Sequence, residues 1–393
     1  MKTDKTHYFA AVMLVALAAL SAGCRKSNTN SGVSAPTSSA APSAVQPDLN
    51  HPEGGTAVLA ETKYFKGSIG DALDLQMKLI RSGDQLNGSY SYQKIGTKIS
   101  LRGTVDKEGH VSIDEFDPAG KQTGLFKGFW KTEAADGLVT IAGNWSKPVG
   151  EKTDDKKTAF SVHEEPISLT GDSDFVTKQI KESNKKLVYE ITAQYPQITG
   201  SSNANFEKFN QAARSLVTKT VADFKKDMAL ETGEEQRPEN SMGSSLDISY
   251  KIALAQDDLV SMSVAVASYY QGAAHPNSYS DSLNYDLKNA KVLKLADLFK
   301  PGAKYLPSLA TYCIADLKKQ SSEKGLDDSS INTGAGPTAK NYRSWTISKQ
   351  GLGVNFDAYQ VGPYAAGPQF VLVPYSAIKD LINPEGPIGQ FAK

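Results

Sequence analysis

The side chains that could carry chemistry in this chain are few and widely spaced. Four of its five histidines lie beyond residue 23, and each is isolated in the sequence: His51, His110, His163 and His275. None has the spacing of a zinc site, and neither a Gly-x-Ser-x-Gly nucleophile elbow nor a phosphate-binding loop occurs. We therefore predict no catalytic residue, no metal ion and no cofactor. One alternative stays open, a hydrolase in which His275 acts as acid–base beside Asp286 and Asp297.

The segment 268–277, with the sequence SYYQGAAHPN, is typical of an exposed turn between two strands. Gly272 and Pro276 favour a turn that directs His275 away from a strand end. Tyrosine and histidine offer rigid contact area with polar tips, which suits a protein or glycan surface. The candidate binding residues are Tyr269, Tyr270, His275, Asn277, Tyr359 and Tyr364. The alternative is structural: His275 bonds a strand-end carbonyl, the tyrosines pack in core and loops, and Asp297 starts a short turn.

A different chemistry is indicated at Cys24. A basic start precedes the uncharged run 8–23, whose apolar part of about twelve residues is too short to span a bilayer. The run ends in Leu-Ser-Ala-Gly-Cys, which resembles the bacterial lipobox with Ser21 where leucine is commonest. We expect cleavage before Cys24, a diacylglyceryl group on its thiol and an N-acyl chain such as palmitate, which together anchor the chain to a membrane. The alternative is an ordinary secretory signal whose cysteine is coincidental.

The expected location is the bacterial cell envelope. Arg25 follows the cysteine and carries no inner-membrane retention signal, so in a Gram-negative host we expect the outer membrane, facing the periplasm. If Cys24 is acylated, Cys313 is the one cysteine left and has no disulfide partner within the chain. The apolar residues around Cys313 predict a buried thiol on a helix.

Composition excludes other classes. The 393 residues include 43 basic and 43 acidic side chains, so the formal net charge is zero and the positive surplus typical of nucleic-acid binding is missing. Two cysteines are too few for a disulfide-dense scaffold. The apolar content of 39% is too high for a disordered chain and sufficient for a sizeable core.

Changes of pattern along the chain predict four segments. Residues 1–23 are a lipoprotein signal peptide, and residues 24–57, rich in serine, alanine and proline, form a flexible tether. Residues 58–165 contain short runs of alternating polarity between turn residues, which predicts an antiparallel, barrel-like β-meander. A short connector, 164–174, leads to an α+β domain at 175–393 with a mixed or antiparallel sheet and two main helices. The overall class is α+β.

The elements of the last domain follow from periodicity. Apolar residues between 206 and 228 recur at helical spacing, and a second helix fits 303–320. Strands are predicted at 187–195, 246–255, 258–270, 279–287, 342–348, 351–359 and 369–374. In the β-meander, glycines such as Gly128 and Gly143 stand two residues before a tryptophan, where they would relieve crowding between bent strands.

Ordered motifs in this domain carry a resemblance to a known family. They are Gly-Ala-Ala-His-Pro-Asn at 272–277, Asp-Leu-Phe at 297–299 and Tyr-x-x-x-x-Tyr-Ala-Ala-Gly at 359–367. Over about residues 180 to 380 the chain resembles the extracytoplasmic domain shared by RsiV-type anti-sigma factors and the non-catalytic part of the PdaC peptidoglycan deacetylase. The resemblance implies a role in binding lysozyme or cell-wall material.

Two departures limit what this resemblance implies. A lipobox chain lacks the cytosolic segment and membrane-spanning helix of an anti-sigma factor, and the paired histidines of the PdaC catalytic domain have no counterpart here. The sequence therefore predicts a lipid-anchored, non-catalytic protein that binds a lysozyme-like protein or peptidoglycan, and no nucleic acid. A small-ligand or lipid carrier that uses the β-meander, and the hydrolase with His275, are the alternatives.

Overall fold

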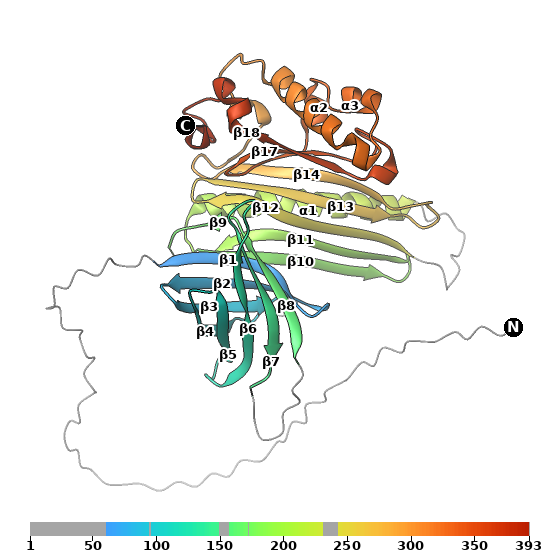
Figure 1. Cartoon of the computed structure of the whole chain (residues 1–393). Helices are drawn as coiled ribbons and strands as arrows, with labels where there is room; N and C mark the ends of the chain where they lie inside the picture. The colour runs from blue at the N-terminus through green and yellow to red at the C-terminus, as the bar shows by residue number, and fades with distance from the viewer. Residues whose placement is uncertain (1–59, 94–95, 149–156, 172, 231–242, 393) are drawn as a thin grey trace, which may run out of the picture. The chain divides into compact units, whose positions relative to one another are not determined.

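The computed structural model describes residues 60–392, except 94–95, 149–156, 172 and 231–242. Its first eight strands, blue to green in Figure 1, form an antiparallel sheet that closes into a barrel because β1 pairs with both β2 and β8. Their bounds are β1 Glu61–Ile69, β2 Leu73–Ser82, β3 Gln85–Tyr92, β4 Ile99–Val105, β5 His110–Phe116, β6 Gln122–Thr132, β7 Val139–Ser146 and β8 Thr158–Glu165.

Alternating polarity builds the barrel, as the sequence predicts. In β2, Leu75, Met77 and Leu79 are buried while the residues between them are partly exposed. Aromatic rings from other strands meet edge to face in the same core, and the ring of Phe126 lies 5.0 Å from that of Phe160, centroid to centroid. These side chains occupy the interior in which the carrier alternative would need space for a ligand.

Two glycines let the barrel strands approach closely. Gly128 of β6 is the register partner of Gly143 of β7. A Cβ atom on Gly143 would lie 2.1 Å from the Lys127 carbonyl oxygen and 2.4 Å from the Gly128 Cα atom, both well inside van der Waals contact. The predicted role of these glycines, relief of crowding between strands, is confirmed.

One carboxylate is held inside the barrel by neutral donors. Glu115 is only 5% exposed, and it accepts hydrogen bonds from the Tyr90 hydroxyl at 2.8 Å, the Trp145 indole N–H at 2.9 Å and the Thr123 hydroxyl at 2.7 Å. Three donors compensate much of the desolvation of a buried charge. Burial raises the pKa of Tyr90, so this hydroxyl stays protonated and keeps donating.

The second sheet has seven strands in the order β10-β11-β12-β13-β14-β15, with β9 beside β12. Pairing is antiparallel except for β11 with β12 and β9 with β12, which are parallel. We call this the central sheet. Its strands are β9 Ile167–Ser168, β10 Asp174–Asn184, β11 Tyr189–Thr199, β12 Ser244–Gln256, β13 Leu259–Tyr269, β14 Asn277–Asp286 and β15 Lys291–Val292.

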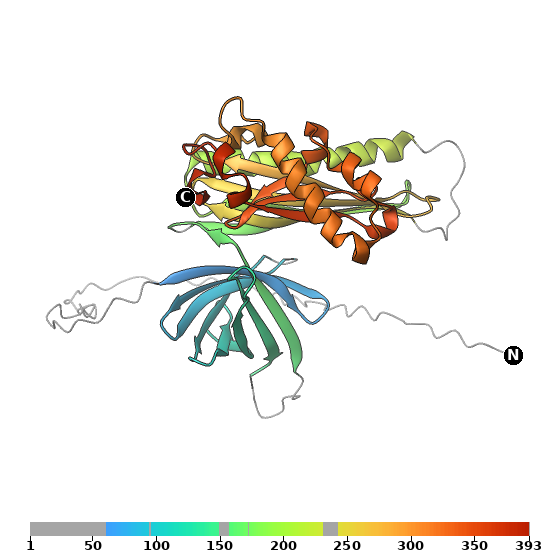
Figure 2. The ribbon, with the colours of Figure 1, turned by 45° about the horizontal axis from the view of Figure 1, so that its top comes forward.

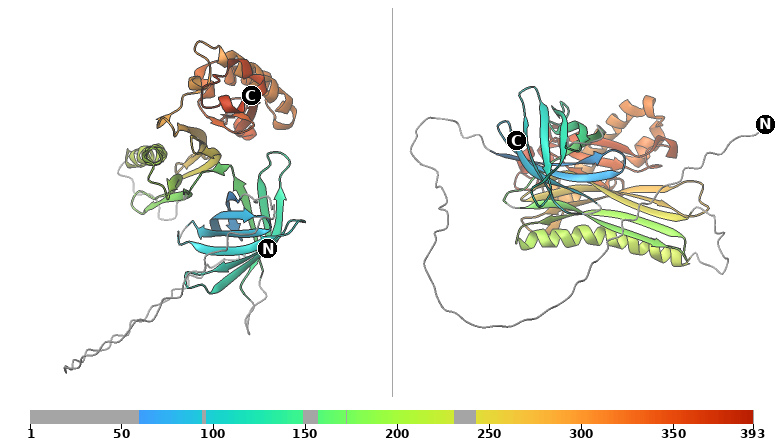
Figure 3. Two further views of the ribbon diagram at one scale, coloured as in Figure 1. Left: turned by 90° about the vertical axis from the view of Figure 1, so that its left-hand side faces the viewer. Right: turned by 90° about the horizontal axis from the view of Figure 1, so that it is seen from below.

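Helix α1, Ala204–Leu230, covers one face of the central sheet (Figure 3). Its buried residues recur every three or four positions, so that a single stripe of the helix faces the strands. The stripe consists of Phe206, Phe209, Asn210, Ala213, Val217, Val221, Phe224 and Met228. The predicted helix over 206–228 is confirmed, with one more half-turn at each end.

A smaller, three-stranded sheet lies beside β13 and β14. It contains β16 Trp345–Ile347, β17 Gly351–Phe356 and β18 Gln369–Pro374, and it packs with α2 Tyr305–Lys324 and α3 Asp328–Gly334 in a separate apolar core (Figure 2). Buried hydrogen bonds join it to the central sheet: Asn284 donates to the Trp345 carbonyl at 2.8 Å, and the Ile347 N–H donates to the Ser261 hydroxyl at 2.7 Å.

The barrel is joined to the central sheet through β1 and β2, and all described residues belong to one compact unit. Tyr64 of β1 is buried in the core of the central sheet, and its hydroxyl donates to the Ser173 carbonyl at 2.8 Å. Asp174, which begins β10, pairs with Lys78 at 3.0 Å and also with Lys98. The outer face of the barrel is therefore fixed to the sheet by one buried ring and a charged network.

The α+β class is confirmed, with corrections of detail. The segment 164–174, expected as a connector, contains the end of β8 and the short strand β9, because β9 adds to the edge of β12 that β11 leaves free. Strand β10 and helix α3 were not expected. Six short 3₁₀ helices join the elements of the C-terminal part: Leu295–Leu298, Ala339–Tyr342, Tyr364–Ala366, Tyr375–Ala377, Lys379–Leu381 and Gly389–Phe391.

The signal peptide, the tether and Cys24 lie outside the described residues. The predictions made for them therefore remain predictions. Among the helices that are described, none is long and apolar enough to cross a membrane.

Replacing Glu115 with alanine should destabilise the barrel. The change leaves the Tyr90 and Trp145 donors without their buried acceptor, and we expect the free energy of unfolding to fall by about 3 kcal/mol. Urea denaturation followed by tryptophan fluorescence measures it. Lys127→Ala, at an exposed position of the same barrel, is the control and should change the value by less than about 0.5 kcal/mol. A fall below about 1 kcal/mol for Glu115→Ala would contradict the role given to this carboxylate.

Cys313 should be inert in the native protein. It lies on α2 with its side chain fully buried in the core, as predicted, and burial raises the pKa of the thiol to about 12. Because the thiolate is the reactive form, a thiol reagent at pH 8 should label Cys313 at a rate set by unfolding, and rapidly once denaturant is added. Stoichiometric labelling of Cys313 in the folded protein within minutes, located by peptide mapping to distinguish it from Cys24, would show that the site opens locally.

Candidate functional site

Three of the predicted binding residues come together on the surface. The ring of His275 stacks on that of Tyr364, with centroids 4.1 Å apart, and Tyr359 lies on the other side, 5.4 Å from Tyr364. The Tyr364 hydroxyl donates to the Pro276 carbonyl at 2.9 Å, and His275 Nδ1 donates to the same oxygen at 2.9 Å. We call His275, Tyr359 and Tyr364 the aromatic patch. The alternative that His275 bonds a strand-end carbonyl is thus also realised, in the same geometry.

The backbone beneath the patch is held in place by buried polar contacts. Asp357, 8% exposed, accepts from the Ser280 N–H at 2.7 Å and pairs with Arg343. The Gln360 side chain accepts from the Asp357 N–H at 3.1 Å and donates to the carbonyls of Gly334 and Asn341, both at 3.0 Å. These bonds fix the loop that presents Tyr359 and Tyr364 against the β13–β14 turn.

Tyr359 has an uncommon backbone conformation. Its φ angle is +68°, in the left-handed region that costs a non-glycine residue about 1–2 kcal/mol, yet its side chain is 66% exposed. An exposed ring in a strained position gains little from burial. Strain of this kind persists where the surrounding contacts impose it, and it is concentrated at functional sites.

The other predicted binding residues lie apart from the patch. The Tyr270 hydroxyl donates to Asp227 of α1 at 3.2 Å, and its ring packs on Phe224 with centroids 5.5 Å apart, so Tyr270 faces the helix. Tyr269 is half-buried at the end of β13. Asn277 is exposed and begins β14, where it is the register partner of Ser268.

The hydrolase alternative is not supported by the geometry. His275 precedes β14 and Asp286 ends it, so the ten residues of the strand separate them by about 30 Å. Asp286 accepts from the N–H and side chain of Asn289, at 2.8 and 2.7 Å, and closes the turn after β14. Asp297 accepts from the Lys294 N–H at 2.9 Å, so its role is to cap the 3₁₀ helix Leu295–Leu298, although it lies within this turn and not at its start as expected.

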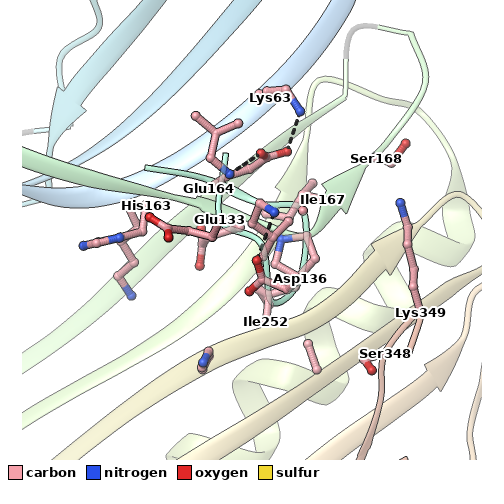
Figure 4. Close-up of a pocket in the computed structure, with 18 of the residues that line it drawn as sticks. Lys63, Glu133, Asp136, His163, Glu164, Ile167, Ser168, Ile252, Ser348 and Lys349 are labelled. Atoms are coloured by element: carbon pink, nitrogen blue, oxygen red, sulfur yellow. Dashed lines mark hydrogen bonds and ion pairs between the residues drawn. The ribbon is translucent and has the colours of Figure 1, made fainter. Parts of the chain in front are cut away.

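A large groove, which the sequence did not reveal, lies between the barrel, the central sheet and the small sheet (Figure 4). Its volume is about 1680 Å³. The barrel contributes the loop 133–138 and residues 163–165, the central sheet contributes Ser249, Lys251 and Ser263, and the small sheet contributes the turn 348–350, Phe370 and Leu372. At one point the Gln350 side chain donates to the Asp136 carbonyl at 3.4 Å and bridges barrel and small sheet.

The barrel wall of the groove carries an internal ion pair. Lys63 lies 3.0 Å from Glu164, whose other oxygen accepts from the Val139 N–H at 2.9 Å. Burial alone would lower the pKa of Lys63, but hydrogen bonds to Glu61 and Glu164 raise it above its ordinary value. These groups are paired within the protein and serve to shape the wall.

Two other charged groups of this wall lack such partners. Lys66 places its ammonium 4.4 Å from the centroid of the Tyr250 ring, and the side chains of Lys66 and Glu165 make no hydrogen bond or ion pair among the described residues. Burial lowers the pKa of Lys66 and raises that of Glu165, and their mutual attraction opposes both shifts.

One exposed cluster has the donor set for a cation. Asp106, Glu108 and His110 in the β4–β5 turn bring one ligand atom each within 4.8 Å of the others, and His110 Nδ1 lies 2.9 Å from an Asp106 oxygen. The sequence interpretation, which took every histidine as isolated, missed it because the hairpin folds two neighbouring carboxylates onto His110. All three side chains are exposed, as is common for acidic turns without a metal.

Comparisons with known proteins concern the α+β region. Residues 182–278 match the family model described as "Deacetylase PdaC", and residues 296–376 match the one described as "Protein of unknown function (DUF3298)". The two matches support a relation to the PdaC/DUF3298 family.

The chain is also similar to individual proteins. The chain is 28% identical over 177 residues to the peptidoglycan-N-acetylmuramic acid deacetylase PdaC of Bacillus subtilis, which covers 45% of this chain and 37% of that relative. Two solved DUF3298 family structures are similar: one from Bacteroides fragilis (19% identity, TM-score 0.39, 57% of this chain and 98% of that one) and one from Pseudomonas aeruginosa (16%, 0.36, 54% and 96%).

The expectation that the chain is not an enzyme is corrected by these matches. The curated relative is named as a deacetylase, and one matching model carries the same description, which points to an enzyme. That expectation came from the isolated histidines and from the missing paired-histidine motif, and neither observation measures activity. The chain spans about 37% of the relative's length.

Replacing Tyr359 with asparagine should not destabilise the fold. Asparagine tolerates the left-handed region better than tyrosine, and little buried surface is lost, so the free energy of unfolding should hold or rise by up to about 1 kcal/mol. Thermal unfolding measures the change. Tyr375→Asn, at a buried tyrosine, is the control and should cost about 3 kcal/mol. A loss above 1 kcal/mol for Tyr359→Asn would show that the ring is a packing residue.

Proposed function

We propose that this chain is a lipid-anchored protein of the bacterial cell envelope that binds peptidoglycan glycan strands through the aromatic patch. The single observation that carries the proposal is the exposed stack of His275, Tyr364 and Tyr359. Sugar rings present C–H faces that pack on aromatic rings, while hydroxyl and acetamido groups can bond the polar tips of tyrosine and histidine. The matches to a peptidoglycan deacetylase support this class of ligand.

The anchor is proposed to be acylated Cys24, in the outer membrane facing the periplasm if the host is Gram-negative. The tether 24–57 would then give the folded part reach toward the cell wall. A coil of about 30 residues has a mean span on the order of 30 Å. The patch could therefore contact a glycan strand while the chain stays attached to lipid.

A second candidate is deacetylation of peptidoglycan, favoured by the match of residues 182–278 to the deacetylase model. It shares the ligand class with the first proposal, since a deacetylase must also hold the amino-sugar strand. Release of acetate from purified peptidoglycan, measured in the binding experiment below, tests it directly.

The binding proposal predicts co-sedimentation of the full chain with insoluble peptidoglycan. Tyr364→Ala should weaken binding about tenfold, because it removes the central ring of the stack, which corresponds to about 1.4 kcal/mol. Phe129→Ala is the matched control, since Phe129 is an aromatic residue 46% exposed on the barrel, outside the patch. Its affinity should equal that of the unaltered chain.

Two results would decide against the patch. Equal binding by Tyr364→Ala and Phe129→Ala would remove it as the glycan site. Saturable binding to C-type lysozyme, with none to peptidoglycan, would favour instead the protein partner that the RsiV resemblance implies.

A further inference from the structure

Some of the charged side chains that line the groove have no ion-pair partner within the part of the chain that the structure describes. Lys251 of the central sheet and Lys349 of the β16–β17 turn are both exposed, and neither has an ion-pair partner among the described residues. Figure 4 shows Lys349 extending from its turn into the groove, which Lys251 also lines. Two lysines from two separate elements therefore line one space.

Opposite charge is present in the same space, on the barrel wall. Glu165 is half-buried and accepts no hydrogen bond within the described part of the chain. Holding a carboxylate partly out of water without a donor is costly, and a cationic ligand group would relieve this cost. Lys66 is the cation that interacts with Glu165, but its ammonium is directed at the Tyr250 ring.

The remaining lining is polar and small, with one apolar side. Ser249, Ser263 and Thr346 offer hydroxyls, while Phe370 and Leu372 of β18 are 51% and 39% exposed. Large apolar side chains exposed in a groove are typical of a binding surface. The other acidic groups lining it are Glu61, Asp74, Glu133, Asp136 and Glu164, of which Glu61 and Glu164 are both paired with Lys63, and Glu133 is paired with Lys131.

We propose that the groove binds a short peptide that carries both free carboxylates and a free amine, as the stem peptides of peptidoglycan do. Lys251 and Lys349 receive the carboxylates, Glu165 receives the amine, and Phe370 and Leu372 contact the aliphatic side chains. The inference rests on the proposed function, since it names the second part of the same polymer. The aromatic patch binds the sugar, and the groove binds the peptide attached to it.

The test compares three soluble ligands on the full chain by isothermal titration calorimetry. They are a disaccharide–tetrapeptide fragment of peptidoglycan, a peptide-free amino-sugar oligomer, and the free tetrapeptide. The double variant Lys251→Ala/Lys349→Ala should lose at least tenfold in affinity for both peptide-bearing ligands and keep its affinity for the sugar oligomer. Lys127→Ala, which removes an exposed lysine of the barrel outside the groove, is the matched control and should leave all three affinities unchanged.

Glu165→Gln provides an independent measurement at the other end of the ligand. It keeps the shape of the side chain and removes the charge, so it should weaken the tetrapeptide but have no effect on the same peptide with its amine acetylated. Both lysines of the double variant are exposed, so its fold should be intact, and circular dichroism confirms this.

The experiment distinguishes failure of the groove inference from failure of the proposed function. If the sugar oligomer binds and Tyr364→Ala abolishes that binding, but the double variant retains full affinity for the tetrapeptide, the groove inference is wrong and the proposed function stands. If the sugar oligomer does not bind, the proposed function is wrong. Tetrapeptide affinity that depends on Lys251, Lys349 and Glu165 would then still support the groove.

Discussion

The attachment of the barrel to the central sheet is the interaction on which the groove depends. It depends on Tyr64, a barrel residue whose ring is buried in the core of the other sheet and whose hydroxyl bonds the Ser173 carbonyl. Next to it, Asp174 is paired with Lys78 and Lys98 from two different barrel segments. Those pairs lower the pKa of Asp174 against the effect of burial, so the carboxylate stays ionised at neutral pH. Without this attachment the groove would have no barrel wall.

Local sequence patterns were sufficient to predict most helices and strands and the fold class. Period-two alternation in strands such as β2, glycines such as Gly128 that permit close approach, and the helical stripe of α1 are all properties of neighbouring residues. Strand β10 was not predicted because its residues do not alternate between apolar and polar. Only Phe175 of this strand is buried. Strand β9 was not predicted because two residues are too few to show a periodic pattern. It is a strand only through its pairing with β12.

The candidate sites differ in how much of each could be predicted from the sequence. Turn chemistry around Gly272 and Pro276 exposes His275 by local rules, and the tyrosine-rich loop at 359–364 is visible as composition. Their meeting depends on long-range contacts such as that between the Tyr364 hydroxyl and the Pro276 carbonyl. The groove depends on three separate elements, and its lining residues are ordinary outward-facing polar positions in each. No local signal distinguishes Lys251 or Lys349 from any solvated lysine, because the placement of the barrel gives them a common space.

The connection between the barrel and the central sheet has a further consequence, which concerns folding and unfolding. Only Pro166 separates the end of β8, which closes the barrel against β1, from β9, which extends the central sheet beside β12. Proline fixes one backbone angle and leaves little slack between the two strands. Separation of β8 from β1 would therefore strain the edge of the central sheet, and we expect the two sheets to unfold together in spite of their separate cores.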